Sequence, residues 1–354
     1  MKDKIKSSNR ILWIDTIKGF AIIAVIFGHV LLGFEQINAF PSCQKYIVFL
    51  NRWIYSWHMP LFMFVSGITF QFSSLKNFTP NYNKIRKQAL NLALLFLLFC
   101  TLLSVLKVVF AKYVNNPISI HSLLISIILP QTLMWYLWVL IIYYLAFPLL
   151  CSTDQFNKLT FIILFLISSF AYYCYSIGWL NILCIKNLFY CSAFFYLGIY
   201  FFRIKKYLTK AIVAMAGAYL LIEILYLIAL LVNSKNGCIE INIITDQINA
   251  LAVIIVCVYF FQRLNNVSFI TKTIAYLGEN SLVIYLLHTY FITICRKLVL
   301  YFHLGCLISL TICFFAPILT CLIITYFVNR NKYLTYIFKP ILFVDYLRLK
   351  VKKN

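Results

Sequence analysis

Charged residues are scarce in this chain, and acidic ones most of all. Only 11% of its 354 residues are charged, with 9 acidic against 31 basic side chains, whereas soluble domains carry about 25% charged residues. Hydrophobic residues make up 63% of the chain, and the mean hydropathy is +0.91. This composition excludes a soluble globular domain and predicts an all-α, polytopic integral membrane protein.

Three further absences narrow the function. The 12 cysteines form no CxxC pair and no cluster with histidine at metal-ligand spacing, so neither a metal nor a disulfide framework is expected. The ten glycines are scattered singly and form no phosphate-binding loop, which argues against ATP-driven pumping. Internal repeats and long hydrophilic linkers are missing too. Residues 1–354 are therefore expected to form a single membrane domain, with basic cytoplasmic tails at 1–10 and 330–354.

Apolar stretches of membrane-spanning length recur along the chain. A helix needs roughly 20 apolar residues to cross a bilayer. We therefore expect about ten transmembrane helices, near 12–33, 48–72, 88–111, 132–150, 159–178, 188–202, 211–232, 241–262, 273–294 and 305–328. The first stretch contains charges and is not followed by a small-residue cleavage site, so it is expected to stay as a helix rather than be removed as a signal peptide.

The net charge of +22 follows the expected topology. With ten spans and a cytoplasmic N-terminus, 22 lysines and arginines fall on the inner side, and 8, including Arg296, fall on the outer side. This positive-inside asymmetry places both termini in the cytoplasm of a multi-pass cell-membrane protein, which we expect in a bacterial inner membrane. Membrane lipids are expected partners of the basic tail, and a nucleic-acid partner is not expected. The sequence does not indicate an oligomeric state.

The first apolar stretch carries three ionisable residues, Asp15, Lys18 and His29. Each costs roughly 2.5 to 3.5 kcal/mol inside a membrane, so such residues usually persist where a substrate, ion or proton needs them. Lys18 and His29 are 11 positions apart, which is three helical turns plus about 20°. They are expected on one stripe about 16 Å apart, with Lys18 near the cytoplasmic face and His29 deep in the membrane.

Four motifs follow one another along the chain. Lys18 and His29 enclose ten residues, 56–67 read SWHMPLFMFVSG, 135–138 read WYLW, and 278–288 read GENSLVIYLLH. In this order they resemble the membrane acyltransferase 3 family, of the surface-polysaccharide O-acetyltransferase type and similar to fucose 4-O-acetylases. The resemblance covers about ten helices' worth of chain. It implies transfer of an acyl group, usually acetyl from acetyl-CoA, to a hydroxyl of a surface carbohydrate or a related acceptor.

The resemblance and the chemistry of the side chains suggest roles in the first helix. His29 is expected to be catalytic, as the general base that takes the proton of the acceptor hydroxyl or as a carrier of the acyl group. Lys18 is expected to bind the phosphates or the pantetheine arm of CoA. Asp15 lies within about 40° of the His29 face and is also expected to be catalytic, by tuning Lys18 or by orienting a group of the donor. Alternatively, His29 is a histidine of the packed core that bonds to another helix, and Lys18 extends its side chain toward the membrane surface while it pairs with Asp15.

The remaining candidate residues lie in three other segments. Lys84, Arg86 and Lys87 match in position a basic motif of the family and are expected to bind CoA phosphates, or else to anchor the inner side of the helix. His58 is expected to line the acceptor cavity, or to bind the carbonyl that Pro60 frees. A third set lies on one face of a helix and consists of Ser281, Tyr285 and His288. These residues are expected to bind the acceptor, or else to form polar contacts between helices.

Two functions from different classes fit these features. The leading interpretation is an O-acyltransferase with cytosolic acyl-CoA as donor and a cell-surface carbohydrate, or its lipid-linked precursor, as acceptor. The alternative is a carrier or flippase for a lipid-linked sugar or small solute, for which buried charges in about ten helices are equally natural. The order of the motifs and the lack of two repeated halves favour the enzyme. A receptor without chemistry fits Lys18 and His29 least.

Overall fold

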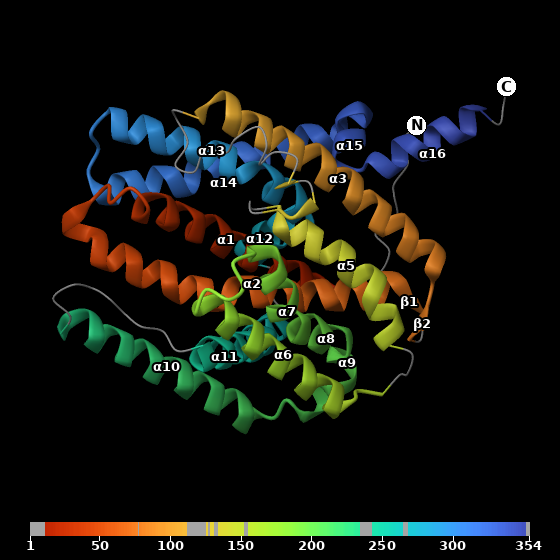
Figure 1. Ribbon diagram of the computed structural model, residues 1–354, viewed down its shortest axis with the longest axis horizontal. Helices are drawn as coiled ribbons and strands as arrows, with labels where there is room; N and C mark the ends of the chain where they lie inside the picture. Colours follow the sequence, from red (N-terminus) through yellow and green to blue (C-terminus); the bar gives the residue numbers. More distant parts are fainter. Residues whose placement is uncertain are drawn as a thin grey trace.

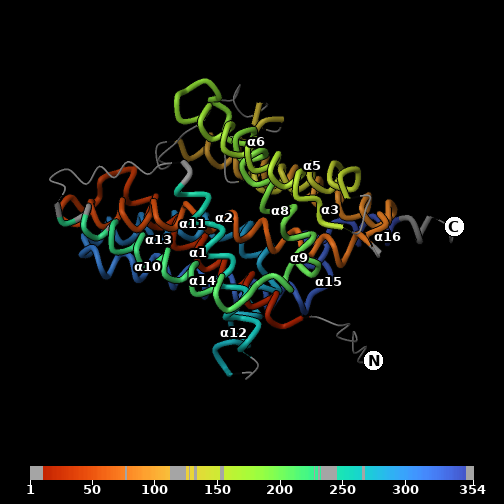
Figure 2. The backbone as a smooth tube through the Cα atoms, turned by 90° about the horizontal axis from the view of Figure 1, so that it is seen from below, coloured from red at the N-terminus to blue at the C-terminus, as the bar shows by residue number. Residues whose placement is uncertain are grey.

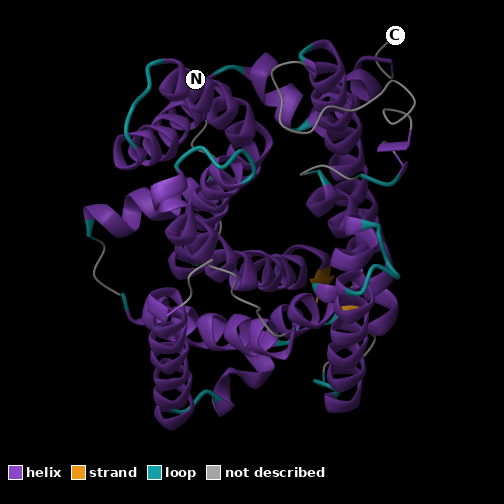
Figure 3. Ribbon diagram, turned by 60° about the vertical axis from the view of Figure 1, so that its left-hand side comes forward, coloured by secondary structure: helices purple, strands orange, loops and turns teal. Residues whose placement is uncertain are grey.

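The protein is built almost entirely from helices (Figure 3). The computed structural model describes residues 11–76, 78–111, 125–126, 128–130, 134–151, 155–233, 243–264 and 268–351. Within these ranges, strand pairing consists of the antiparallel β1 (Leu75–Lys76) and β2 (Thr79–Pro80). The predicted all-α class is therefore confirmed for the described chain.

The helices fall into two length classes. The long ones are α1 (Leu12–Glu35), α2 (Gln44–Ser74), α3 (Tyr82–Val109), α5 (Trp135–Leu150), α6 (Lys158–Ser176), α10 (Lys210–Asn233), α11 (Ile243–Arg263), α13 (Ser281–Tyr301) and α14 (Cys306–Arg330). The short ones are η1 (Pro41–Cys43), α7 (Leu183–Tyr190), α8 (Ser192–Ile199), α9 (Phe201–Ile204), η3 (Lys205–Tyr207), α12 (Phe269–Glu279), α15 (Lys332–Phe338) and α16 (Pro340–Val351).

Six of the described helices are long and apolar enough to cross a membrane: α1, α3, α6, α11, α13 and α14. A seventh span results if α7 to η3, which bend by 60° at a break, count as one. Helices such as α6 and α14 expose large apolar side chains, as expected of surfaces that face lipid. The chain is thus a multi-pass membrane protein, while the ten spans and the cytoplasmic termini stay predictions.

The cytoplasmic position of the C-terminus is testable with fusions. We expect a C-terminal alkaline phosphatase fusion to be inactive and a C-terminal fluorescent-protein fusion to be bright in a bacterial host, because the basic residues after 330 favour the inner side. The phosphatase folds only outside the cytoplasm, so the two fusions report opposite sides. An active phosphatase with a dark fluorescent fusion would contradict the predicted topology.

The span expected at 273–294 is wrong in its boundaries, because the helix is interrupted at Asn280 and α13 continues to Tyr301. The Asn280 side chain donates to the Tyr276 carbonyl (2.9 Å) and accepts a hydrogen bond from Asn329 of α14 (3.1 Å). A side chain that binds its own backbone in this way competes with helix continuation. The span expected at 188–202 is likewise divided, into α7, α8 and α9.

Arg296 lies beyond the expected end of its span, at residue 294, but inside α13. It is only 7% exposed, and its expected position on the outer side of the membrane stays a prediction. Its guanidinium packs over Gly33 of α1, where a Cβ atom would overlap it. The apolar residues that follow Lys297 carry the helix past both basic side chains.

Helix α1 lies in the interior of the molecule, between α2 and the later helices α12, α13 and α14 (Figure 1). Figure 2 shows α3, α5 and α6 on one side of these central helices and α12 projecting on the opposite side. The backbones of α1 and α12 touch at two glycines. A Cβ at Gly19 would overlap the Ile274 carbonyl, and one at Gly278 would overlap the Asp15 carbonyl. Small residues allow such close approach of helices in membranes.

This contact leads to a prediction about stability. Gly278→Val should push α12 away from α1, because the Asp15 carbonyl belongs to the backbone and cannot rotate aside. We expect a loss of roughly 1–3 kcal/mol, as for overpacked cores, seen as a lower unfolding midpoint of the detergent-purified protein. Gly217→Ala in α10 is the matched control, since nothing lies within 4 Å of a Cβ at that position. Equal midpoints for the two variants would contradict the α1–α12 contact.

Candidate functional site

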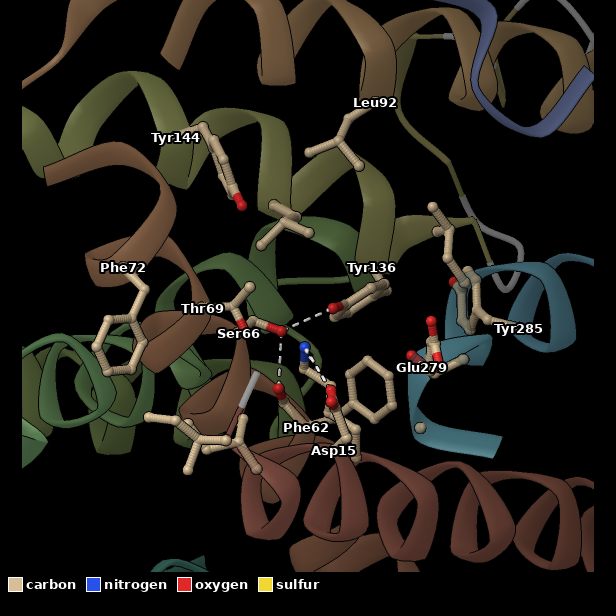
Figure 4. A pocket seen from close by; sticks show the side chains of 17 residues that line it. Asp15, Phe62, Ser66, Thr69, Phe72, Leu92, Tyr136, Tyr144, Glu279 and Tyr285 are labelled. Atoms are coloured by element: carbon tan, nitrogen blue, oxygen red, sulfur yellow. Dashed lines mark hydrogen bonds and ion pairs between the residues drawn. The ribbon is translucent and has the colours of Figure 1, made fainter. Parts of the chain in front are cut away.

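A pocket of about 600 Å³ opens where α1, α2, α3 and α5 meet the break between α12 and α13 (Figure 4). Its apolar wall includes Phe62, Phe72 and Leu92. Its polar wall comes from five helices and consists of Asp15, Lys18, Ser66, Thr69, Tyr136, Tyr144, Glu279, Ser281 and Tyr285. The break at Asn280 places the last three of these residues at the pocket, because it ends α12 and starts α13 there.

Lys18 and Asp15 form an ion pair in this pocket. The Lys18 Nζ lies 3.9 Å from the Asp15 Oδ1, and the side chains are 22% and 18% exposed. The i, i+3 pairing that belonged to the alternative interpretation of Lys18 is therefore present in the structure. The pocket lining contains this one lysine and two carboxylates, those of Asp15 and Glu279. Its charge thus suits a polar, largely neutral ligand better than a polyanion.

Residues from three separate motifs meet on the opposite wall. The hydroxyls of Ser66 and Tyr136 lie 2.8 Å apart, and Ser66 also donates to the Phe62 carbonyl (2.8 Å). Since Ser66 has one hydrogen, the Tyr136 hydroxyl is then the donor in the pair. The Tyr136 ring lies 5.2 Å from the ring of Tyr285 on α13. Neither Ser66 nor Tyr136 was singled out from the sequence, although both lie within motifs that were.

A cluster of three histidines lies beyond the pocket, on α1, α2 and α13. The rings of His29 and His288 are 5.3 Å apart, and Tyr55 stacks edge-on against His58 at 4.7 Å. The Tyr55 hydroxyl lies 3.0 Å from the Nδ1 of His29. His58 and His288 are buried, whereas His29 and Tyr55 are partly exposed. Three histidines predicted from separate segments are thus brought together, with Tyr55 as an unpredicted fourth member.

Tyr285 connects the pocket to this histidine cluster. Its ring lies in the pocket wall and 6.0 Å from the ring of His288, which in turn lies 5.3 Å from His29. Ser281 begins the same helix and lines the pocket. The predicted face of Ser281, Tyr285 and His288 therefore runs from the pocket to His29, while His29 itself is not among the residues that line the pocket.

Asp15 and His29, the two residues expected to be catalytic, lie far from each other. They are 14 positions apart on one helix, about 21 Å along its axis. Asp15 instead belongs to the pocket, with Lys18. The distance along the helix axis therefore separates the two expected catalytic residues.

The basic cluster lies on the exposed start of α3 and outside the pocket lining. Lys84, Arg86 and Lys87 are all exposed, and the Lys84 backbone N–H is capped by the Asn81 side chain. Lys87 forms an ion pair with Asp345 of α16. This pairing joins α3 to the C-terminal helix, and the structure does not bring the cluster into contact with the pocket residues.

The alternative reading of His58 needs a correction. Its Nδ1 lies 2.7 Å from the carbonyl of Ile54, one turn earlier in α2. Pro60 lacks an N–H and therefore frees a different carbonyl, that of Ser56. The Tyr190 hydroxyl of α7 lies 3.5 Å from that oxygen. His58 is thus bound to its own helix but not to the carbonyl freed by proline.

Within the described residues, no group of three or more His, Cys, Asp or Glu side chains is arranged to hold a metal ion. Comparison with known proteins gives one match. The family model described as an acyltransferase domain, acyltransferase 3, matches residues 11–327 and so includes both the pocket and the histidine cluster. No curated protein and no solved structure matches the chain.

Proposed function

Since this chain belongs to the acyltransferase 3 family of membrane acyltransferases, we propose that it moves an acetyl group from cytosolic acetyl-CoA to a hydroxyl of a cell-surface carbohydrate or its lipid-linked precursor. The observation that carries the proposal is the meeting of four separate motifs in one continuous path. Lys18 and Ser66 lie at the pocket with Tyr136, and Tyr285 and His288 lead from it to His29.

The pocket suits the acyl-pantetheine part of the donor. Its volume of about 600 Å³ is within the roughly 300–1,000 Å³ of small-molecule sites. The Lys18–Asp15 pair offers donors and acceptors to the pantetheine amides, and the carboxylates disfavour phosphate inside the pocket. We assign the CoA phosphates to the cytoplasmic side of the pocket, where Lys18 is the cation of the pocket lining. Lys84, Arg86 and Lys87 would attract the phosphates from a greater distance.

His29 is the proposed general base. It takes the proton of the acceptor hydroxyl while the hydroxyl oxygen bonds to the thioester carbonyl carbon. The carbon–sulfur bond then breaks, and the CoA thiolate receives the proton from the His29 imidazolium. Ser281 and Tyr285 line the pocket and are proposed to hold the acyl end of the donor. His58 and His288 lie in the same cluster as this base. For Asp15 we propose donor binding in place of the expected catalytic role.

Deleting the gene and analysing the surface glycans tests this proposal. We expect the glycan to reach the surface without acetyl esters, and the wild-type gene, but not a His29→Ala variant, to restore them. Mass spectrometry of the purified glycan measures the esters. A carrier or flippase predicts a different result, namely loss of the glycan itself from the surface, and that result would overturn the enzymatic proposal.

A further inference from the structure

The hydrogen-bond partners of the three histidines differ. The Nδ1 of His288 lies 3.0 Å from the Ile284 carbonyl, and the Nδ1 of His58 lies 2.7 Å from the Ile54 carbonyl. A carbonyl oxygen only accepts hydrogen bonds, so Nδ1 must carry the hydrogen in both rings. In a neutral imidazole this leaves Nε2 with a lone pair and no hydrogen. The tautomers of His288 and His58 are therefore set by their own helices.

The Nε2 of His288 has an unused lone pair. His288 is 0% exposed, and its Nε2 has no hydrogen-bond partner among the described residues. Buried polar atoms are nearly always hydrogen-bonded, so an exception calls for an explanation. The ring of His29 is close by, with its centroid 5.3 Å from that of His288 and the planes inclined by 33°. At this separation, one nitrogen from each ring pointing along the line between the centroids would lie about 3 Å apart, a hydrogen-bond distance.

The partner of His29 leaves its tautomer open. A phenol hydroxyl both donates and accepts, so the contact of Tyr55 with Nδ1 of His29 persists with the hydrogen on either atom. If the Tyr55 hydroxyl donates, the neutral His29 carries its hydrogen on Nε2. That hydrogen is the donor that the lone pair of His288 lacks. All donors and acceptors then agree in one direction, from Tyr55 through His29 and His288 to the Ile284 carbonyl.

We propose that His288 is a positioning residue, whose Nε2 accepts the Nε2–H of His29 and thereby makes Nδ1 the basic nitrogen of His29. Nδ1 accepts the Tyr55 hydroxyl, and both side chains are partly exposed, so the acceptor hydroxyl would displace the Tyr55 hydroxyl and donate to Nδ1 in its place. Its proton passes to Nδ1, giving an imidazolium whose Nε2–H stays bound to His288. Nδ1 then returns the proton to the CoA thiolate, and His288 neither gains nor loses a proton. This inference rests on the proposed function of His29.

Two substitutions of His288 separate this role from a structural one. In His288→Asn the amide nitrogen replaces Nδ1 and keeps the bond to the Ile284 carbonyl, but nothing replaces Nε2. In His288→Gln the longer side chain places an amide oxygen near the position of Nε2. We expect His288→Asn to lower kcat by about 100-fold, as when a general base is lost, and to leave the KM for acetyl-CoA unchanged. We expect His288→Gln to retain at least a tenth of wild-type activity. Thr293→Val, on the same helix with a hydroxyl bound to the Thr289 carbonyl, should leave kcat unchanged.

A purely structural role predicts the reverse order, with Asn active and Gln impaired, and that order would overturn the proposal. Nitrogen-15 NMR of histidine-labelled protein in nanodiscs gives a readout without activity. The signals of His29, assigned with His29→Ala, should show the hydrogen on Nε2 in the wild type and a mixture of tautomers in His288→Asn. A wild-type hydrogen on Nδ1 would also overturn the proposal. If the wild type shows the expected tautomer but never consumes acetyl-CoA, the proposed function fails instead.

Discussion

Replacing His29 with alanine is expected to abolish acetyl transfer. A positioned general base contributes about 100- to 10,000-fold to the rate, and within the histidine cluster both neighbouring imidazoles are held at Nδ1 by their own helices. His29 is the histidine of this cluster that is partly exposed, and we therefore expect it to be the one that the acceptor reaches. We expect kcat to fall by at least 100-fold, measured as acetyl transferred by equal amounts of folded protein.

The loss must be separated from misfolding. His29 is not fully buried, so its removal should leave expression and the elution profile in detergent near those of the wild type. His303→Asn is a suitable control, because this histidine lies in the exposed turn after α13 and outside both the pocket and the histidine cluster. Acetylation by His29→Ala at the wild-type rate would remove His29 from the mechanism.

Replacing Lys18 with methionine is expected to weaken binding of acetyl-CoA. The change keeps the length and the apolar stem of the side chain but deletes the charge that lies in the pocket beside Asp15. A hydrogen bond to a charged group contributes about 1.5–3 kcal/mol, so the KM for acetyl-CoA should rise about 10- to 150-fold. The carboxylates of Asp15 and Glu279 stay in the pocket lining and add to this effect by repelling the CoA phosphates. The measurement is the donor KM and kcat at low and at high salt.

Lys18→Arg is the matched variant, because it keeps the charge. It should retain much of the activity, and the difference between the arginine and methionine variants should shrink at high salt, which screens charge–phosphate attraction. An unchanged donor KM in Lys18→Met together with a raised acceptor KM would contradict the assignment. Lys18 would then belong to the carbohydrate site and not to the donor site.

Features that depend on spacing within one helix were predictable from the sequence. The period of an α-helix fixes which side chains share a face, and it correctly paired Lys18 with Asp15 and aligned Tyr285 with His288. The same geometry explains why Asp15 and His29 do not meet. The angle between them is small, but the rise of about 1.5 Å per residue keeps them far apart.

Features that depend on packing between helices were not predictable. The contact of Ser66 with Tyr136 joins residues 70 positions apart, and no local pattern indicates that α2 and α5 meet there. Tyr55 could have been found, since it lies three positions before His58 and so near the same face, but its bond to His29 depends on how α1 packs on α2.

Two helix boundaries were predicted wrongly, for a physical reason in each case. The span was expected to end at 294, before Arg296, yet α13 continues to Tyr301 because Gly33 leaves room for the Arg296 guanidinium inside the protein. Asn280 was read as part of one apolar helix because the hydropathy on both sides is high. Its side chain bonds to Tyr276 and Asn329 instead end α12 there, and this break helps to form the pocket.

Release of CoA by the purified chain tests the central claim most directly. The full-length protein in nanodiscs is given acetyl-CoA with or without glycan from a strain that lacks the gene, and free thiol is measured over time. The account predicts glycan-dependent release of CoA by the wild type, matched by acetyl esters on the glycan, and no release by His29→Ala. No release by the folded wild type with this glycan, or equal release by both proteins, would contradict it.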